Sequence, residues 1–323
     1  MIFFIIVLRA LAAILITNSH YTGIYPTDLI ANGGLLGDVI FFSVSGYCLY
    51  NTKNNFFKWY GKRIYRIYIP VIVITLFYLI IGSYSLDENS IFWWILYPTY
   101  YHFVASIIIL YIPYYIIMKI DYFKKNVIHI MIIIALIWIG IYILFYDKSY
   151  YHIDTVREPM IRFLFFEAML LGALFRQKDD IVRNKFSFIN LIGLIISLMA
   201  YFGTKMLFSK IESIAYFQIF NQFMLLVLLF FLFKFFASLD SKLEQLPNFI
   251  KQILYFVAKI TLEIYLVQYV IIDFIRPLFS FPINWFVLTA SIIIAAFALH
   301  LFCDFLYKLF KKIKIKIIGE NIA

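Results

Sequence analysis

The sequence predicts a polytopic, all-α membrane protein with about ten transmembrane helices. Hydrophobic residues make up 64% of the 323 positions and charged residues only 14%, and the mean hydropathy is +0.90. A soluble domain does not need this much apolar surface, whereas apolar runs of about 20 residues have the length that crosses a bilayer. The composition therefore argues against a soluble enzyme and makes the lipid bilayer a partner of the chain.

Ten apolar segments follow one another along the chain and are the expected spans. They cover residues 2–19, 35–52, 66–82, 97–118, 127–146, 161–176, 186–208, 214–238, 252–274 and 283–307. The first segment has no basic region before it and carries Arg9 in mid-run, so we interpret it as a retained span and not as a cleaved signal peptide. The connections are short, and we expect a single membrane domain over residues 1–323 with no fused soluble domain.

The basic residues gather in alternate loops, which predicts the orientation. Twenty of the 28 Lys and Arg residues lie in one set of loops, at 53–66, 119–125, 176–185, 234–251 and 308–316. Only five lie in the opposite loops, namely Lys148, Arg157, Lys205, Lys210 and Arg276. Since cytoplasmic loops are enriched in Lys and Arg, both termini are expected in the cytoplasm and the 20–34 loop outside. The net charge of +10 thus reflects topology, and we expect no nucleic-acid partner.

The first span carries the two residues with the clearest chemical potential. Arg9 is rare in a bilayer segment because a buried arginine costs several kcal/mol, and such residues are functional by default. His20 lies eleven positions later, about three helical turns, so the two share one face roughly 16 Å apart along the axis. The alternatives are an arginine that snorkels to the interface and an ordinary histidine at a helix end.

Three motifs in the first 70 residues point to a family. The first is the Arg9–His20 pair. The second is the sequence from Gly37-Asp38 through Phe41-Phe42 to Ser45-Gly46-Tyr47, and the third is the basic stretch Lys62-Arg63-Ile-Tyr65-Arg66-Ile-Tyr68-Ile-Pro70. Together, in this order, they resemble the acyltransferase-3 family of integral-membrane O-acyltransferases, of the bacterial polysaccharide O-acetyltransferase type.

Weaker similarities extend along the chain, and some positions depart from the family pattern. His102 and Arg162 lie in segments that are similar to later family motifs. Asp38 follows Gly37 directly, one place early, and no tryptophan follows His102. Gln268 stands where the family usually has histidine, and because an amide does not titrate, this argues against proton transfer at Gln268.

The resemblance implies transfer of an acyl group, for which we expect acetyl, from cytoplasmic acyl-CoA to a hydroxyl of a surface polysaccharide or lipid-linked saccharide. In this interpretation His20 is the general base and Arg9 positions the donor. The expected substrate-binding residues are Arg63, Arg66, Asp38, Ser45, His102 and Arg162. We expect acyl-CoA as a co-substrate and no bound cofactor, and a multi-pass location in the cell membrane, with polysaccharide-synthesis proteins as further partners.

Other interpretations of the same residues stay open. The alternative for Arg63 and Arg66 is that they only anchor the orientation of the chain in the membrane. Asp38 and Ser45 share a helix face that suits polar helix packing. Glu263 is expected to pair with Lys259 one turn earlier, and His300 is expected to be a packing or surface residue. Cys48 and Cys303 have neither a metal spacing nor a disulfide framework, so no metal site is expected. The runner-up functions are a transporter or flippase for a glycan precursor, and a structural partner in an export complex.

Overall fold

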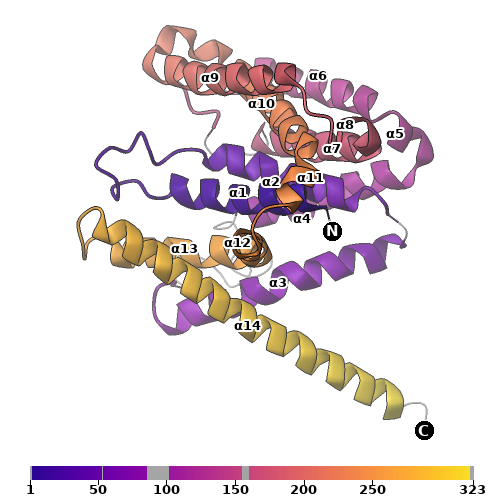
Figure 1. Cartoon of the computed structure of the whole chain (residues 1–323), viewed down its shortest axis with the longest axis vertical. Coiled ribbons are helices and arrows are strands. Elements are labelled where there is room, and N and C mark those ends of the chain that lie inside the picture. Colours follow the sequence, from indigo (N-terminus) through magenta and orange to yellow (C-terminus); the bar gives the residue numbers. More distant parts are fainter. Residues whose placement is uncertain (1, 53, 86–101, 155–159, 321–323) are drawn as a thin grey trace. The chain divides into compact units, whose positions relative to one another are not determined.

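A computed structural model describes residues 2–52, 54–85, 102–154 and 160–320, and every regular element in these ranges is a helix (Figure 1). Lys53, Arg157 and the start of the predicted 97–118 segment lie outside them. The long helices are α1 (Phe3–Ser19), α2 (Gly34–Leu49), α3 (Phe56–Ile80), α4 (His102–Lys119), α6 (Val127–Phe145), α7 (Met160–Gln177), α9 (Phe188–Lys210), α10 (Ile219–Ser238), α12 (Asn248–Lys259), α13 (Thr261–Ile275) and α14 (Ile283–Glu320). The short ones are α5 (Asp121–Lys125), α8 (Asp179–Val182), the 3-10 helix η3 (Glu212–Phe217) and α11 (Asp240–Glu244). The all-α prediction is confirmed for the described residues.

Each of the ten predicted segments contains at least one helix, but they differ in how well they suit a membrane. Among the described residues, six helices are long and apolar enough to cross a membrane, namely α3, α4, α6, α9, α10 and the Ile283–Lys312 part of α14. Helices α1 and α2 are apolar but shorter, and α7 holds three charged residues, Arg162, Glu167 and Arg176. The chain is thus a membrane protein with several spans, and the count of ten stays a prediction.

Two predicted boundaries differ from the structure. The basic stretch 53–66 was expected to be a loop, but α3 begins at Phe56, so Lys58, Lys62, Arg63 and Arg66 lie on its first turns. Lys and Arg are themselves good helix formers, so a basic stretch does not by itself end a helix. The segment 252–274 was expected to be one span, whereas the backbone bends at Ile260 and separates α12 from α13.

The helices form two compact units. Unit 1 comprises residues 1–16, 33–60 and 105–258, and unit 2 comprises residues 17–32, 61–104 and 259–323. Unit 1 therefore holds most of α1, α2, most of α4, and α5 to α12. Unit 2 holds the loop after α1, most of α3, the start of α4, and the α13–α14 pair.

The core of unit 1 is the close contact of α2 with α7. A Cβ on Gly46 would meet the backbone of Met169, and a Cβ on Gly172 would meet the carbonyl of Ser43, in each case far inside 3.0 Å. Such approach of two backbones is possible only where both helices present glycine, the usual way of packing helices in a membrane. The rings of Phe42 and Phe165 stack beside this crossing at 4.3 Å between centroids.

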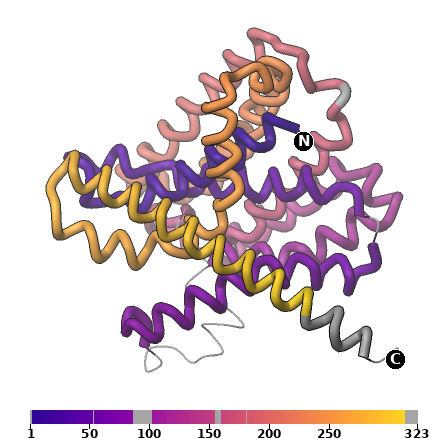
Figure 2. Tube along the Cα trace, turned by 60° about the horizontal axis from the view of Figure 1, so that its bottom comes forward, coloured from indigo at the N-terminus to yellow at the C-terminus, as the bar shows by residue number. Residues whose placement is uncertain are grey.

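In unit 2, helices α13 and α14 run side by side in opposite directions, which is visible in both Figure 1 and Figure 2. The first turns of α14 contact the loop that follows α1. There the Asn284 amide donates to the carbonyl of Ile24 (3.3 Å) and Tyr21 shares a hydrogen bond with Thr289 (3.0 Å). These contacts fix the end of unit 2 at which His20 lies.

Candidate functional site

His20 lies directly after the last residue of α1, where it meets two other elements of unit 2. Its Nε2 is 3.2 Å from the hydroxyl of Tyr269 on α13, and the two rings lie edge to face at 4.6 Å. His102, at the first turn of α4, lies within electrostatic range of His20. The structure thus brings two predicted site residues, His20 and His102, to one place, and it adds Tyr269.

The loop around His20 is held in place by its own hydrogen bonds. Tyr25 donates to the side-chain oxygen of Asn18 (2.6 Å), and the Trp285 indole donates to the hydroxyl of Tyr25 (2.9 Å). The Asn18 amide in turn donates to the carbonyls of Ile30 and Asn32. A base that must meet a substrate within about 3 Å benefits from this kind of fixed surrounding.

Burial lowers the pKa of His20 from its ordinary 6.5 to about 4, because the charged imidazolium loses hydration. The side chain is therefore neutral at physiological pH and has a lone pair available on one ring nitrogen. If Nε2–H donates to Tyr269, Nδ1 carries that lone pair.

The other end of unit 2 is basic. Arg63 is half-buried and Arg66 is exposed on the first turns of α3. The hydroxyl of Tyr307 on α14 donates to the backbone carbonyl of Arg66 (3.0 Å), and the rings of Tyr65 and Tyr307 pack at 5.2 Å. This contact brings α3 close to the part of α14 that carries the exposed side chains of Lys308, Lys311 and Lys312. Two segments that were predicted to be cytoplasmic thus meet at one end of unit 2.

The remaining predicted site residues belong to unit 1. Arg9 is half-buried in α1 and acts electrostatically on Cys48 near the end of α2. Asp38 is buried in α2, and Arg162 lies in the first turn of α7. Ser45 shares a hydrogen bond with Tyr111 of α4 (3.3 Å). This bond is what the packing alternative predicts, and substrate binding at Ser45, Asp38 and Arg162 stays a prediction.

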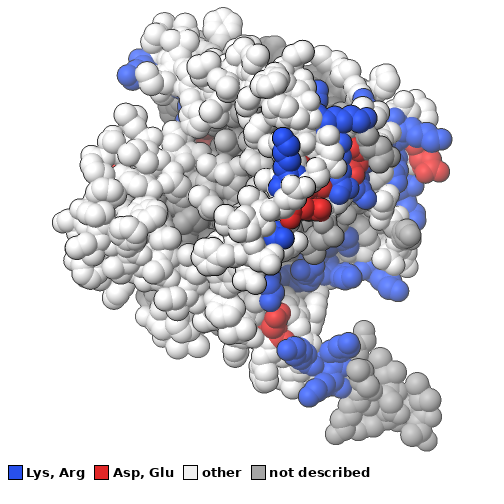
Figure 3. Space-filling view, in the orientation of Figure 1, with Lys and Arg blue, Asp and Glu red and all other residues white. Residues whose placement is uncertain are grey.

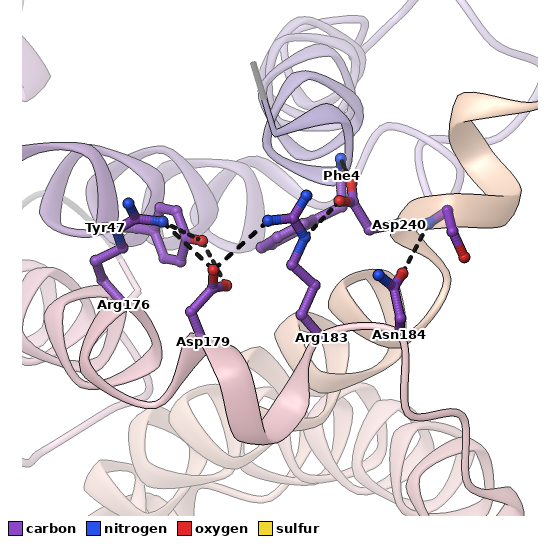
Figure 4. Close-up of polar contacts among 8 residues, drawn as sticks. Phe4, Tyr47, Arg176, Asp179, Arg183, Asn184 and Asp240 are labelled. Atoms are coloured by element: carbon purple, nitrogen blue, oxygen red, sulfur yellow. Dashed lines mark hydrogen bonds and ion pairs between the residues drawn. The ribbon is translucent and has the colours of Figure 1, made fainter.

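A set of ionic contacts that the sequence did not reveal closes one end of unit 1 (Figure 4). In this Arg–Asp network, Arg176 donates to the hydroxyl of Tyr47 (3.1 Å), and Tyr47 donates to Asp179 (2.6 Å). Arg183 lies 3.7 Å from Asp179 and 2.7 Å from Asp240, and the buried Asp240 also accepts from the backbone N–H of Phe4 (2.7 Å). The start of α1, the end of α2, and helices α7, α8 and α11 therefore meet at one end.

The helix ends that meet in the Arg–Asp network belong to loops that the charge pattern predicted to lie on one side of the membrane. Figure 3 shows basic and acidic side chains gathered over α5, α8 and α11, and Lys124 of α5 lies over the ring of Tyr50 at 4.2 Å. Lys205 and Asp154, which both belong to the opposite set of predicted loops, form an ion pair (2.8 Å). The loops joined by these contacts belong to the two sets that the basic residues predicted, while the number of spans and the orientation stay predictions.

One predicted pair is wrong. Glu263 is buried and bonds to Nδ1 of His300 on α14 (2.8 Å), while Lys259 is exposed. Nε2 of His300 lies 3.5 Å from Asp304. The break at Ile260 separates Lys259 from α13, so the one-turn spacing that suggested the pair does not apply. His300 is thus a polar link between α13 and α14.

The comparison with known families now identifies the chain. A search of curated proteins and a search of solved structures each found no significant match. The family described as "Acyltransferase domain", acyltransferase-3, matches residues 2–305, which include every element of both units except the end of α14. The chain therefore belongs to the acyltransferase-3 family of membrane acyltransferases.

Proposed function

We propose that the protein is an O-acyltransferase of the cell membrane that transfers an acyl group, acetyl in the simplest case, from cytoplasmic acyl-CoA to a hydroxyl of a surface polysaccharide or lipid-linked saccharide. The observation that carries the proposal is the environment of His20. Its partial burial keeps it neutral at physiological pH, and Tyr269 orients its ring. It lies within electrostatic range of His102, at the end of unit 2 that the charge pattern predicts to be outside.

The proposed reaction is a direct transfer. His20 accepts the proton of the acceptor hydroxyl while the hydroxyl oxygen attacks the thioester carbonyl carbon. The new C–O bond forms, the C–S bond breaks, and the proton passes from His20 to the departing thiolate. Tyr269 fixes the ring orientation, and His102 contacts the substrate from the other side of His20 in this scheme.

The donor site of the proposal lies at the basic end of unit 2. Lys62, Arg63 and Arg66 of α3 and the lysines of α14 supply positive charge where the chain is expected to face the cytoplasm. The phosphates of acyl-CoA form charge-assisted hydrogen bonds with such groups, and arginine binds them with two parallel bonds. The narrow pantetheine arm then carries the thioester toward the outward half, and positioning the donor is the role proposed for Arg9.

The test is acyl transfer by the purified protein with labelled acetyl-CoA and a saccharide acceptor. We expect the label to appear in an ester of the acceptor in detergent solution, where no membrane separates two compartments. A transporter for a glycan precursor would show no chemistry under these conditions. Failure to form the ester or to release CoA with any acyl-CoA would contradict the proposal.

A further inference from the structure

Gln268 on α13 is a buried amide with no hydrogen-bond partner among the described residues. Its side chain is 0% exposed, and neither Oε1 nor Nε2 is paired. The two comparable glutamines of unit 1 differ. Gln218 accepts from the backbone N–H groups of His152 and Ile153, and Gln222 donates to the carbonyl of Ile153. Gln268 is therefore an exception that calls for an explanation.

Such an arrangement is unfavourable unless something binds there. Leaving a buried donor or acceptor unsatisfied costs about 1–3 kcal/mol, and native proteins satisfy the large majority of such groups. An apolar side chain of similar length would avoid this cost at position 268. The amide is thus suited to a ligand that brings its own hydrogen-bonding groups.

The position of Gln268 connects it to the proposed site. It directly precedes Tyr269, the partner of His20, so it lies within one helical rise, about 1.5 Å along the axis, of the level of this pair. On the helix surface its neighbour one turn earlier is Tyr265, whose ring packs against Phe103 (5.3 Å), next to His102. Gln268 and the His20–Tyr269 pair thus share a level of unit 2.

A second unpaired group lies on the helix that contacts α13 at this point. The hydroxyl of Tyr78 on α3 donates to the carbonyl of Val267 (3.0 Å). Thr75, one turn before Tyr78, is also 0% exposed, and its hydroxyl has no partner among the described residues. Two unsatisfied polar side chains therefore come from two contacting helices.

We propose that Gln268 binds a secondary amide of the donor's pantetheine arm, with Thr75 as a further polar contact. Gln268 Oε1 accepts from the N–H of this amide, and Gln268 Nε2–H donates to another carbonyl of the donor, that of the arm's second amide or of the thioester, so both unpaired atoms are used. A thioester alone offers only an acceptor and would leave Oε1 unsatisfied. The inference rests on the proposed acyl-CoA donor.

The experiment compares two short donors that differ in the amide. Acetyl-S-N-acetylcysteamine has one amide, and S-pentyl thioacetate has the same chain length without it. We expect wild-type protein to prefer the amide donor by at least about tenfold in kcat/KM, because a site that hydrogen-bonds a substrate group rejects the analogue without it. Gln268→Met should bring this ratio close to one, and Thr75→Val should reduce it.

Thermal unfolding provides a second readout and a matched control. Without ligand, Gln268→Met should unfold at the same or a higher temperature than wild type, because it removes an unpaired polar group. Gln222→Met, which loses a formed hydrogen bond, should unfold at a lower temperature and keep the wild-type donor ratio. CoA should raise the unfolding temperature of wild type more than that of Gln268→Met.

The outcomes separate this inference from the proposed function. An unchanged donor ratio in a folded, active Gln268→Met protein would overturn the inference and leave the acyltransferase intact. A loss of discrimination between acceptors, with the donor ratio unchanged, would also overturn it and assign the amide to the acceptor hydroxyl. If wild type transferred nothing but CoA still stabilised it through Gln268, the proposed function would fail and the amide site would stand.

Discussion

At the scale of single residues, the proposed chemistry depends on the neighbours of His20, which set the orientation and the pKa of its ring. The sequence identified the residue and its spacing from Arg9, but Tyr269 is 249 positions away and belongs to a helix whose motif gave no hint of contact. Burial also lowers the pKa of His20, which a sequence cannot report. The same limit applies to Gln268, for which sequence reasoning only argued against proton transfer.

The pH dependence of acyl transfer tests whether the pKa of His20 is lowered. Since the neutral imidazole is the base and its pKa is about 4, we expect kcat/KM to stay constant from pH 7.5 down to about 5 and to be halved near pH 4. A fall of kcat/KM to half its value near pH 6.5 would contradict the partly buried position of His20. The depressed pKa has a second consequence: the unfolded state takes up a proton below pH 6.5 while the folded state does not, so His20 reduces stability as the pH falls from 6.5 toward 4.

At the scale of helices, the close approach of α2 and α7 at Gly46 and Gly172 forms the core of unit 1. The motif with Gly46 and the segment with Gly172 were noticed in the sequence only as family similarities. The structure gives the physical reason, because α2 and α7 approach so closely that neither position has space for a Cβ. The basic stretch before Pro70 was equally visible in the sequence, but its helical form was not, since charge does not distinguish a loop from a helix.

The glycine contact gives a stability prediction. Gly172→Ala should lower the unfolding temperature, by an amount corresponding to about 2 kcal/mol or more, because the new methyl group meets the backbone of α2 and forces the helices apart. Gly140→Ala on α6 is the control, since nothing described lies within 4 Å of its Cβ position, and it should leave the temperature unchanged or slightly higher. Equal effects of the two variants would refute the close packing.

The first turns of α3 give a binding prediction. Changing both Arg63 and Arg66 to Gln should weaken acyl-CoA binding about tenfold or more, because two charge-assisted phosphate contacts are lost. The measurement is a binding titration with the purified variant, with Lys119→Gln on α4, a basic residue of the other unit, as the control. Normal expression together with unchanged donor affinity would show that the two arginines are topology anchors.

At the scale of the whole molecule, the charge pattern predicted more than composition did. The alternate loops that it assigned to one side are the ones that meet in the Arg–Asp network and around Tyr50. The number of spans was less predictable, because the charged residues of α7 and the bend at Ile260 depend on neighbours that a hydropathy pattern does not include. The separation of the site residues into two units was also not visible from the sequence.

Cysteine labelling of intact cells tests the topology. In a background without Cys48 and Cys303, a membrane-impermeant maleimide should label Ser149→Cys and Ser280→Cys directly. Asn54→Cys and Ser241→Cys should react only after permeabilisation. All four positions are exposed. Labelling of residue 54 from the outside would reverse the orientation and move the proposed donor site away from the cytoplasm.

The most direct test of the central claim is to measure donor binding and acyl transfer separately in His20→Ala and Arg9→Ala. If His20 is the base, His20→Ala binds acyl-CoA with wild-type affinity but transfers about 10²–10⁴-fold more slowly. If Arg9 positions the donor, Arg9→Ala loses affinity for acyl-CoA, and Arg9→Lys restores little of it because a single ammonium lacks the forked guanidinium contact. The result that would contradict the account is full acylation of the saccharide by the His20→Ala protein.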